Sequence, residues 1–417
     1  MRAPSGSASR DSAREAPAEP VKRTDAVIRP LLLSSGLAVF GDSLLVLTLV
    51  VWAKELTGSN ASAGLVYALL SVPALFSLAG GSAIDRIAPR RAVLVVSVFS
   101  IVAVVPLYLV HTSDMMWLFY ACTVTYGLST YLFQCARIAA VALLVPPAKH
   151  PSILAILRGS RQIILLVSPA LGTLLFATAG LKWALVATMC LFGLTPLLIW
   201  RVGAVRPPPA AAAHSVGDTF AGIAFILRTA QLRRLCLGLL SYMLCAGFLN
   251  VCVVALLDRT GLPPRDLGIA SLTQGIGSAV GAVIVTRQSA RRPALTLVSA
   301  GLLVATLGSA CVATGAPTGL FVGVFLAGLS LPAILVGCDI TLMASSPAGM
   351  QGRVGLAFEV TTGVPLTLSF FLAAATVDRI GPQLIMGVSV AASLVSVFVI
   401  RSLRADDRTT EGITGAL

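Results

Sequence analysis

The sequence predicts an all-α membrane protein in which twelve transmembrane helices form two related, pseudo-symmetric six-helix halves. Three observations lead to this prediction. The composition is too apolar for a water-soluble domain, long apolar segments follow one another along the chain, and the second half of the chain repeats features of the first.

The composition indicates that lipid is the solvent of most of the chain. Of the 417 residues, 57% are hydrophobic and 11% are charged, and the mean hydropathy is +0.92. A typical soluble domain carries about 25% charged residues. The apolar runs are roughly 18 to 25 residues long, which is enough for a helix to cross a bilayer core of about 30 Å. Because these runs are continuous rather than alternating, they favour helices over a β-barrel.

The chain divides into five predicted segments. Residues 1–25 form a polar tail without an apolar leader, and residues 404–417 form a polar tail for which we expect no regular structure. Residues 26–200 and 235–403 form the two bundles. Residues 201–234 form a linker with three consecutive prolines and an amphipathic helix at the inner leaflet. The spans are expected at 30–53, 61–84, 92–110, 116–145, 153–179, 183–200, 235–257, 267–286, 294–313, 320–344, 354–377 and 383–400.

The basic residues predict the topology. The formal net charge is +13, but the 30 Lys and Arg residues are unevenly distributed between alternate loops. Positive charge accumulates in cytoplasmic loops, so the predicted topology has both termini in the cytoplasm. Only five basic residues fall on the opposite side, namely Lys54, Lys182, Arg259, Arg265 and Arg379.

A repeat relates the two halves. Thr57-Gly58 follows the first span and Thr260-Gly261 follows the seventh. Further along, Gly81 and Arg91 have counterparts in Gly281 and Arg291, whereas Asp85 is replaced by Val285. Related halves of this kind enclose a central site in a large class of transporters.

The segment between the second and third spans reads Gly81-Ser82-Ala83-Ile84-Asp85-Arg86-Ile87-Ala88-Pro89-Arg90-Arg91. Its pattern resembles the signature of the major facilitator superfamily, and the resemblance covers about residues 30–403. Gly41-Asp42-Ser43, Glu55-Leu56-Thr57-Gly58-Ser59 and Gly352-Arg353-Val354 are similar to the branch that contains macrolide and siderophore exporters. The resemblance implies the major facilitator fold and a transport function.

The same segment is a candidate cytoplasmic latch. Gly81 allows close helix approach, and Asp85 can pair with Arg353 at the start of the eleventh span, which the family architecture places opposite. The alternative for Arg86, Arg90 and Arg91 is simple anchoring at the cytoplasmic surface.

Ionisable residues within spans are costly and therefore mark candidate sites. Asp42 lies near the middle of the first span, where removal from water favours the protonated carboxyl, so we expect it to carry protons. The alternative is a packing residue permanently paired with Arg137 or with backbone. Arg137 either neutralises Asp42, which we favour, or binds an anionic group of the substrate. Arg158 and Arg161 are expected to be charges at the cytoplasmic end of the fifth span, with the cavity as the alternative.

Four residues of the second half complete the candidate site. Asp339 and Glu359 are either a second proton site or part of a cytoplasmic gate. Tyr242 and Asn250 either hydrogen-bond the substrate or pack between helices. The family resemblance implies that spans one, four, seven and ten line the cavity, which places Asp42, Arg137 and Asp339 there.

Other functional classes are disfavoured. The glycines from Gly275 to Gly281 imitate a dinucleotide motif, but they lie within a span, where small residues allow close helix packing. The sequence contains no P-loop, catalytic cluster or clustered cysteine motif, so we expect no enzyme activity, cofactor, metal or nucleic-acid partner.

The predicted function is secondary active export of a small amphipathic compound, such as a drug, an antibiotic or another natural product, by proton antiport. The alternatives are a proton-coupled uptake symporter and a membrane receptor or scaffold that does not transport. We expect a monomer in a bacterial cell membrane, with the substrate, protons and lipid as its partners.

Overall fold

The computed structural model describes residues 21–75, 88–145, 180–200, 216–261, 266–289, 291–347 and 351–414, together with single positions between 153 and 178. These residues form helices and short turns, without strands. Nine of the described helices are long and apolar enough to span a membrane, and a shorter apolar helix covers residues 60–73. The predicted all-α membrane class is confirmed.

The first group of helices comes from the N-terminal half of the chain. Its members pack on one another in the pairs α1–α7, α1–α2, α2–α5, α4–α5 and α4–α7. The third span ends as a 3₁₀ helix because Pro106 lacks an amide hydrogen and disfavours continuation of the α-helix. The elements are α1 (Val21–Thr57), α2 (Asn60–Leu75), α4 (Pro89–Val104), η1 (Val105–Leu109), η2 (Ser113–Met115), α5 (Met116–Leu144) and α7 (Leu181–Trp200).

The second group comes from the C-terminal half and is closely packed through small residues. Gly277 and Gly281 lie against the backbone of Phe325 and Leu329, leaving no room for a Cβ atom. The glycine run is therefore a packing surface between α10 and α12, as predicted. The elements are α9 (Ala230–Arg259), α10 (Asp266–Gln288), α11 (Ala294–Ala313), α12 (Pro317–Ser345), α13 (Gln351–Ile380) and α14 (Pro382–Thr414).

Helical structure extends into segments expected to be linker or tail. Within the linker, α8 (Val216–Arg228) packs against the start of α13, with Ile226 in a buried cluster that includes Val354 and Ala357. The first helix begins at Val21, inside the predicted N-terminal tail, and α14 continues to Thr414. The end of α14 contains several good helix formers and no proline, which explains its departure from the expectation.

The repeated Thr-Gly pairs form matching turns. Gly58 and Gly261 have φ angles of 68° and 69°, a left-handed conformation that glycine adopts without a Cβ clash. The hydroxyls of Thr57 and Thr260 donate to the carbonyl four residues earlier, at 2.7 and 2.8 Å. The repeat seen in the sequence therefore has the same local geometry in both halves.

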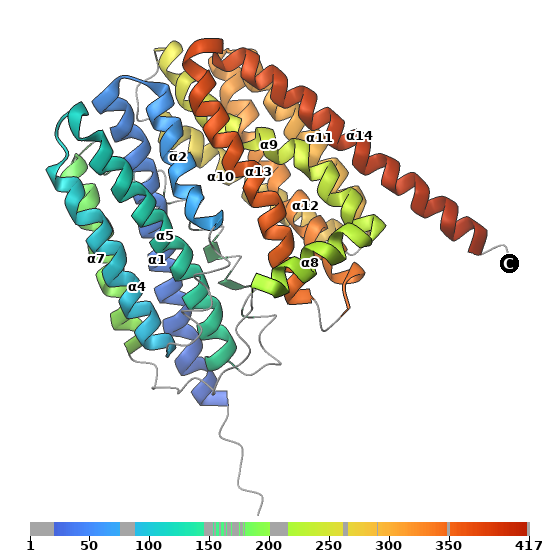
Figure 1. The fold of residues 1–417 in the computed structure, drawn as a ribbon, viewed down its shortest axis with the longest axis horizontal. Helices are drawn as coiled ribbons and strands as arrows, with labels where there is room; N and C mark the ends of the chain where they lie inside the picture. Colours follow the sequence, from blue (N-terminus) through green and yellow to red (C-terminus); the bar gives the residue numbers. More distant parts are fainter. Residues whose placement is uncertain are drawn as a thin grey trace, which may run out of the picture.

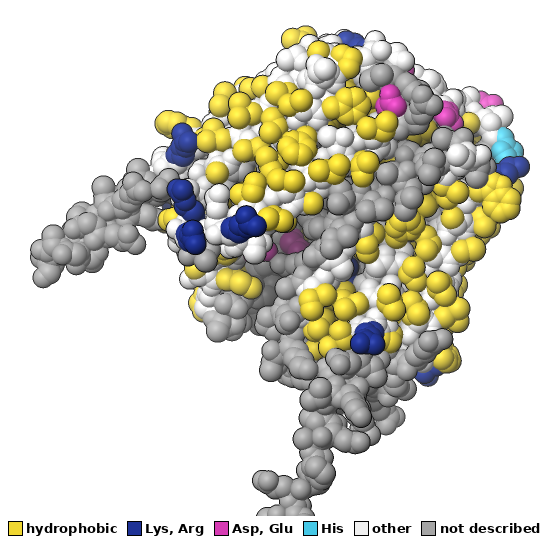
Figure 2. All heavy atoms as spheres, turned by 180° about the vertical axis from the view of Figure 1, so that it is seen from behind, with side chains coloured by type: hydrophobic (Ala, Val, Ile, Leu, Met, Phe, Trp, Pro, Cys, Tyr) yellow, Lys and Arg dark blue, Asp and Glu magenta, His cyan; other side chains and the backbone are white. Residues whose placement is uncertain are grey.

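The two halves meet at one end and diverge toward the other. In Figure 1 the helices of the halves approach each other near the α1–α2 turn and separate toward the end where α8 lies. On the face shown in Figure 2, hydrophobic side chains cover much of both halves, and Lys and Arg side chains gather near the tail end of α14. We call the end that carries the turns at 58–59 and 260–261 the closed end.

Contact between the halves at the closed end is made by α2 against α9 and α13. A Cβ atom on Gly64 would lie 2.8 Å from Cγ1 of Val251 and 3.1 Å from Cβ of Ala374. Farther along α2, Tyr67 stacks on Phe370 with ring centroids 5.6 Å apart. Gly64 therefore allows an approach that a larger residue would prevent.

Two carboxylates of the C-terminal half hold the α1–α2 turn, and we call this set of contacts the clamp. Asp378 accepts hydrogen bonds from the Ser59 hydroxyl at 2.9 Å and from the Ala61 amide at 3.1 Å. A carboxylate at this place caps the first turn of α2 and meets the positive end of its dipole.

The second clamp carboxylate is Asp258. Its Oδ1 atom lies 3.0 Å from Nζ of Lys54, and its Oδ2 atom accepts a 3.5 Å hydrogen bond from Asn60. The Asp258 side chain is 49% exposed, so the ion pair is worth roughly 0–1 kcal/mol. The clamp is therefore weak enough to open.

We predict that Gly64→Leu opens the closed end, because the added side chain cannot fit against Val251 and Ala374. Spin labels attached at Ser113→Cys and Ala316→Cys, in a background without accessible native thiols, should then show a larger share of long label-to-label distances. The measurement is double electron–electron resonance. The matched control is Gly193→Leu, since a Cβ atom at Gly193 meets nothing within 4 Å. An unchanged distance distribution in a folded Gly64→Leu protein would contradict the account of this contact.

We predict that Asp378→Ala also favours the open form, by the roughly 0.5–2 kcal/mol typical of a helix cap. The same label pair should report a change of about two- to thirtyfold in the ratio of the two forms. Asp114→Ala, which removes an exposed acid at the same end, should leave the ratio unchanged. Equal effects of the two substitutions would mean that surface charge, rather than the cap, controls closure.

Candidate functional site

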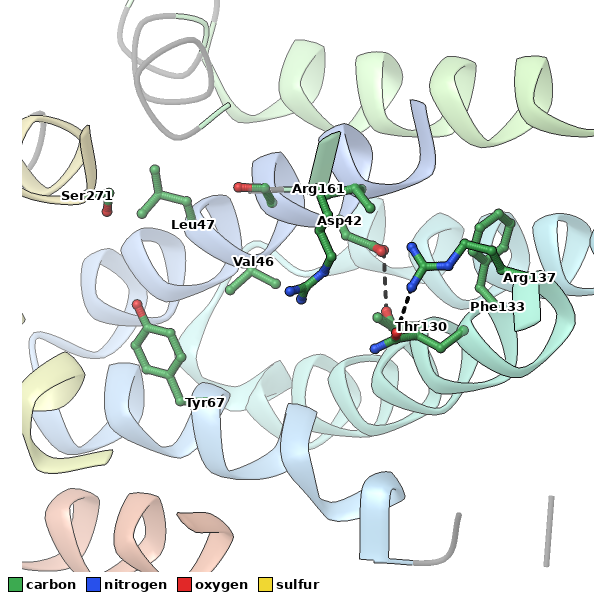
Figure 3. A pocket seen from close by; sticks show the side chains of 12 residues that line it. Asp42, Val46, Leu47, Tyr67, Thr130, Phe133, Arg137, Arg161 and Ser271 are labelled. Carbon is green, nitrogen blue, oxygen red and sulfur yellow. Dashed lines mark hydrogen bonds between the residues drawn. The ribbon is translucent and has the colours of Figure 1, made fainter. Parts of the chain in front are cut away.

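A cavity of about 260 Å³ lies between the two halves (Figure 3). It receives side chains from α1, α2, α5 and the fifth-span segment of the first half, and from α10 of the second. The lining residues are Val39, Asp42, Ser43, Val46, Leu47, Tyr67, Thr130, Phe133, Gln134, Arg137, Arg161 and Ser271.

Helical periodicity explains why α1 and α5 dominate the lining. On α1 the lining positions recur at intervals of three and four residues from Val39 to Leu47, and on α5 they recur in the same way from Thr130 to Arg137. Such spacing places side chains on a single helix face. Each helix thus presents polar and apolar groups together to the cavity.

Asp42 is held in place by two hydroxyl groups of α5. The Tyr126 hydroxyl donates to Oδ1 of Asp42 at 2.5 Å, and the Thr130 hydroxyl donates to the same atom at 3.3 Å. Tyr126 is 1% exposed and packs against Phe192 of α7, with ring centroids 6.1 Å apart. The carboxylate therefore has a fixed position and neutral hydrogen-bond donors.

Two guanidinium groups share the cavity with Asp42. Arg137 donates a 2.9 Å hydrogen bond to Oε1 of Gln134 on the preceding turn of α5. Arg161 points its guanidinium into the cavity (Figure 3). Both arginines are close enough to Asp42 to interact with its charge. Of the two possibilities for Arg161, a charge at the cytoplasmic end of the fifth span or a group in the cavity, the structure supports the cavity, because the side chain reaches inward from the fifth span.

The other predicted binding residues do not line this cavity. Tyr242 packs against the buried cluster of Leu239, Leu302 and neighbouring residues, which supports its packing alternative. Asn250 is half-buried on α9. Asp339 on α12 is also half-buried.

Glu359 lies outside the cavity on an open face of α13. It is exposed and occupies the same helix face as Phe370, three turns away. Cβ atoms at Gly355 and Gly363, one turn before and after it, would meet nothing within 4 Å. This row of α13 therefore has room for a side chain at both glycine positions.

Most of the predicted latch lies outside the described residues, namely Gly81, Asp85 and Arg86, and only the backbone of Arg353 is described, within α13. The guanidinium of Arg90 lies over the Trp200 ring, 3.2 Å from its centroid. This cation–π contact joins two helices of one half and supports the anchoring alternative for Arg90. Arg91 is exposed.

Sequence reasoning missed two sets of residues. Tyr126 and Thr130 lie on the same face of α5 as Arg137. Thr130 follows Tyr126 by four residues and precedes Arg137 by seven, and this helical spacing was a usable signal. The clamp residues Lys54, Asp258 and Asp378 gave no such signal, because their contacts join helices far apart in the sequence.

Comparison with known proteins places the chain in a family. Residues 31–254, more than half of the chain, match the family model described as Major Facilitator Superfamily. Enterobactin exporters EntS of Shigella boydii and Escherichia coli are 31% identical over 148 residues. That match covers 34% of this chain and 33% of the length of each of those relatives.

Solved structures share the fold over most of the chain. The nucleoside transporter NupG superimposes with a TM-score of 0.71 at 13% identity, covering 90% of this chain and 98% of that one. The human organic anion transporter MFSD10 (TETRAN) gives a TM-score of 0.64 at 18% identity, covering 92% and 100%. The family match and these folds agree with the sequence resemblance. The chain belongs to the Major Facilitator Superfamily, and it is a multi-pass membrane transporter rather than an enzyme.

Proposed function

We propose that this transporter exports a small amphipathic compound by proton antiport, with Asp42 as the proton-carrying group. The main support is the position of the Asp42 carboxylate, which is fixed in a cavity between two halves that are closed at one end. A carboxylate away from bulk water changes its protonation readily when its surroundings change. Opening and closing of the closed end would change the surroundings of Asp42 in this way.

Orientation follows from the charge distribution. The positive-inside rule puts the turns at 58–59 and 260–261 outside the cell, since the loops at that end carry few basic residues. The described state would then be open toward the cytoplasm and closed outside by the clamp. Cargo would enter the cavity from the cytoplasm and leave after the clamp opens.

One observation supports export. The relatives that match over 33% of their own length are described as enterobactin exporters. The energy would come from inward movement of a proton, which an inside-negative membrane potential favours by about 2.3 kcal/mol per 100 mV and which could drive either direction. We further propose that the protein acts as a monomer in the cell membrane, with the linker at 201–234 joining its two halves.

Proton-coupled uptake is the second candidate. Among the described lining residues there are two arginines and one carboxylate, so protonation of Asp42 raises the net positive charge of this part of the cavity. A proton and an anion would then strengthen each other's binding and cross together, which is the behaviour of a symporter. Direction of net movement distinguishes this candidate from export.

We predict that Asp42→Asn abolishes proton-driven net transport, because the amide cannot take up and release the proton. The measurement is accumulation of fluorescent amphipathic dyes by proteoliposomes under an imposed pH gradient, with and without a protonophore. Exchange of dye across the membrane without a gradient should persist in the variant. Asp114→Asn, the same substitution at an exposed site, should behave as the wild type.

The direction of dye movement tests the proposal itself. Movement opposite to the proton gradient supports export, and movement with it supports the uptake candidate. Gradient-driven transport that survives Asp42→Asn would show that another group carries the proton.

A further inference from the structure

The cavity has more positive than negative charge. Its described lining contains the guanidiniums of Arg137 and Arg161 and the single carboxylate of Asp42. The remaining polar lining groups are hydroxyls and one amide, which are neutral. An excess cation in a partly desolvated site is unfavourable unless an anion or water compensates it.

The carboxylate does not depend on the arginines alone. Tyr126 and Thr130 both donate hydrogen bonds to Asp42, so neutral groups stabilise part of its charge. Arg161 extends into the cavity, and its residue is solvent-accessible there (Figure 3). Its planar group of donors suits bidentate recognition of an anionic oxygen pair.

Apolar side chains line the same cavity beside these charged groups. Val46 and Leu47 of α1 and Phe133 of α5 line the same cavity. A ligand that satisfies the whole site therefore needs an anionic group beside an apolar body.

We propose that the cargo is an amphipathic anion whose negatively charged group binds Arg161, with Arg137 as the second cation and Val46, Leu47 and Phe133 as the apolar surface. This assignment rests on the proposed function only in taking the cavity as the cargo site. Because the anion and the Asp42 proton would strengthen each other's binding, an anionic cargo favours the uptake candidate over proton antiport.

The charge of Asp42 should affect how tightly the cavity binds an anion. The charged and titratable groups around Asp42 are Tyr126 and Arg137 on α5, Arg161 on the fifth span and Tyr67 on α2. Replacing Asp42 with asparagine keeps the side-chain size and removes the one negative charge of this set. Anion binding should then become tighter.

The experiment uses the full-length protein in phosphatidylcholine nanodiscs and three ligands with one fluorophore. Dansyltaurine carries a sulfonate, dansylethanolamine carries a hydroxyl in its place, and dansylethylenediamine carries an ammonium. We expect the wild type to bind dansyltaurine roughly tenfold more tightly than the other two. Arg161→Gln should remove that preference, Arg161→Lys should retain part of it, and Asp42→Asn should strengthen dansyltaurine binding several-fold.

Three results in phosphatidylcholine nanodiscs would overturn the proposal. They are absence of dansyltaurine binding, equal or tighter binding of an uncharged or cationic ligand by the wild type, and an anion preference that survives Arg161→Gln. Loss of dansyltaurine binding when phosphatidylglycerol is added would assign the site to a lipid headgroup and also overturn it. The wild-type comparison is decisive even if a variant fails to fold.

Failure of the proposed function would be seen separately. Anion-selective binding without gradient-driven dye movement in proteoliposomes would reject proton-coupled transport and leave the anion site intact. Gradient-driven movement of cationic dyes only, with no anion preference in binding, would reject the anion site and leave proton-coupled transport intact.

Discussion

The close approach of α2 to α9 and α13 is the contact on which the rest of the arrangement depends. Gly64 has no side chain, so Val251 and Ala374 of the other half reach the surface of α2. This approach brings the α1–α2 turn within hydrogen-bond distance of Asp378 and Asp258. It also aligns Tyr67 with Phe370, beside the cavity that Tyr67 lines. Steric fit sets the geometry, and the weak polar clamp leaves it reversible.

The cavity combines a fixed carboxylate with cations that belong to different helices. Asp42 is restrained by α5, whereas Arg161 enters from the fifth span and Ser271 from the second half. A rearrangement of the halves therefore moves Ser271 and changes the access of water to Asp42 without altering the bonds of Asp42 to Tyr126 and Thr130. That separation provides a physical basis for linking protonation to conformation, since the stability of a charged carboxylate depends on nearby charges and water.

Local patterns in the sequence predicted much of the fold. Apolar runs identified the spanning helices, the Thr-Gly pairs identified matching turns, and the glycine run identified helix packing. Within the site, Asp42 and Arg137 were predictable because charges in apolar spans are conspicuous. For Arg161 the cavity was the second alternative, and the clamp acids gave no signal, because such roles depend on which distant helices meet. The latch predicted around Asp85 lies outside the described residues and stays a prediction, whereas the observed clamp holds the α1–α2 turn.

Reversible cross-linking of the closed end tests the central claim most directly. Ser59→Cys and Asp378→Cys would place two thiols at positions whose side chains meet through a 2.9 Å hydrogen bond, so that oxidation can join them while this end is closed, and Gly64 stays intact. Each single substitution, in the same background without accessible native thiols, serves as the control. The account predicts that oxidation stops transport in the double variant and that reduction restores it. Transport that continues at the wild-type rate with the disulfide fully formed would contradict the claim that this end must open.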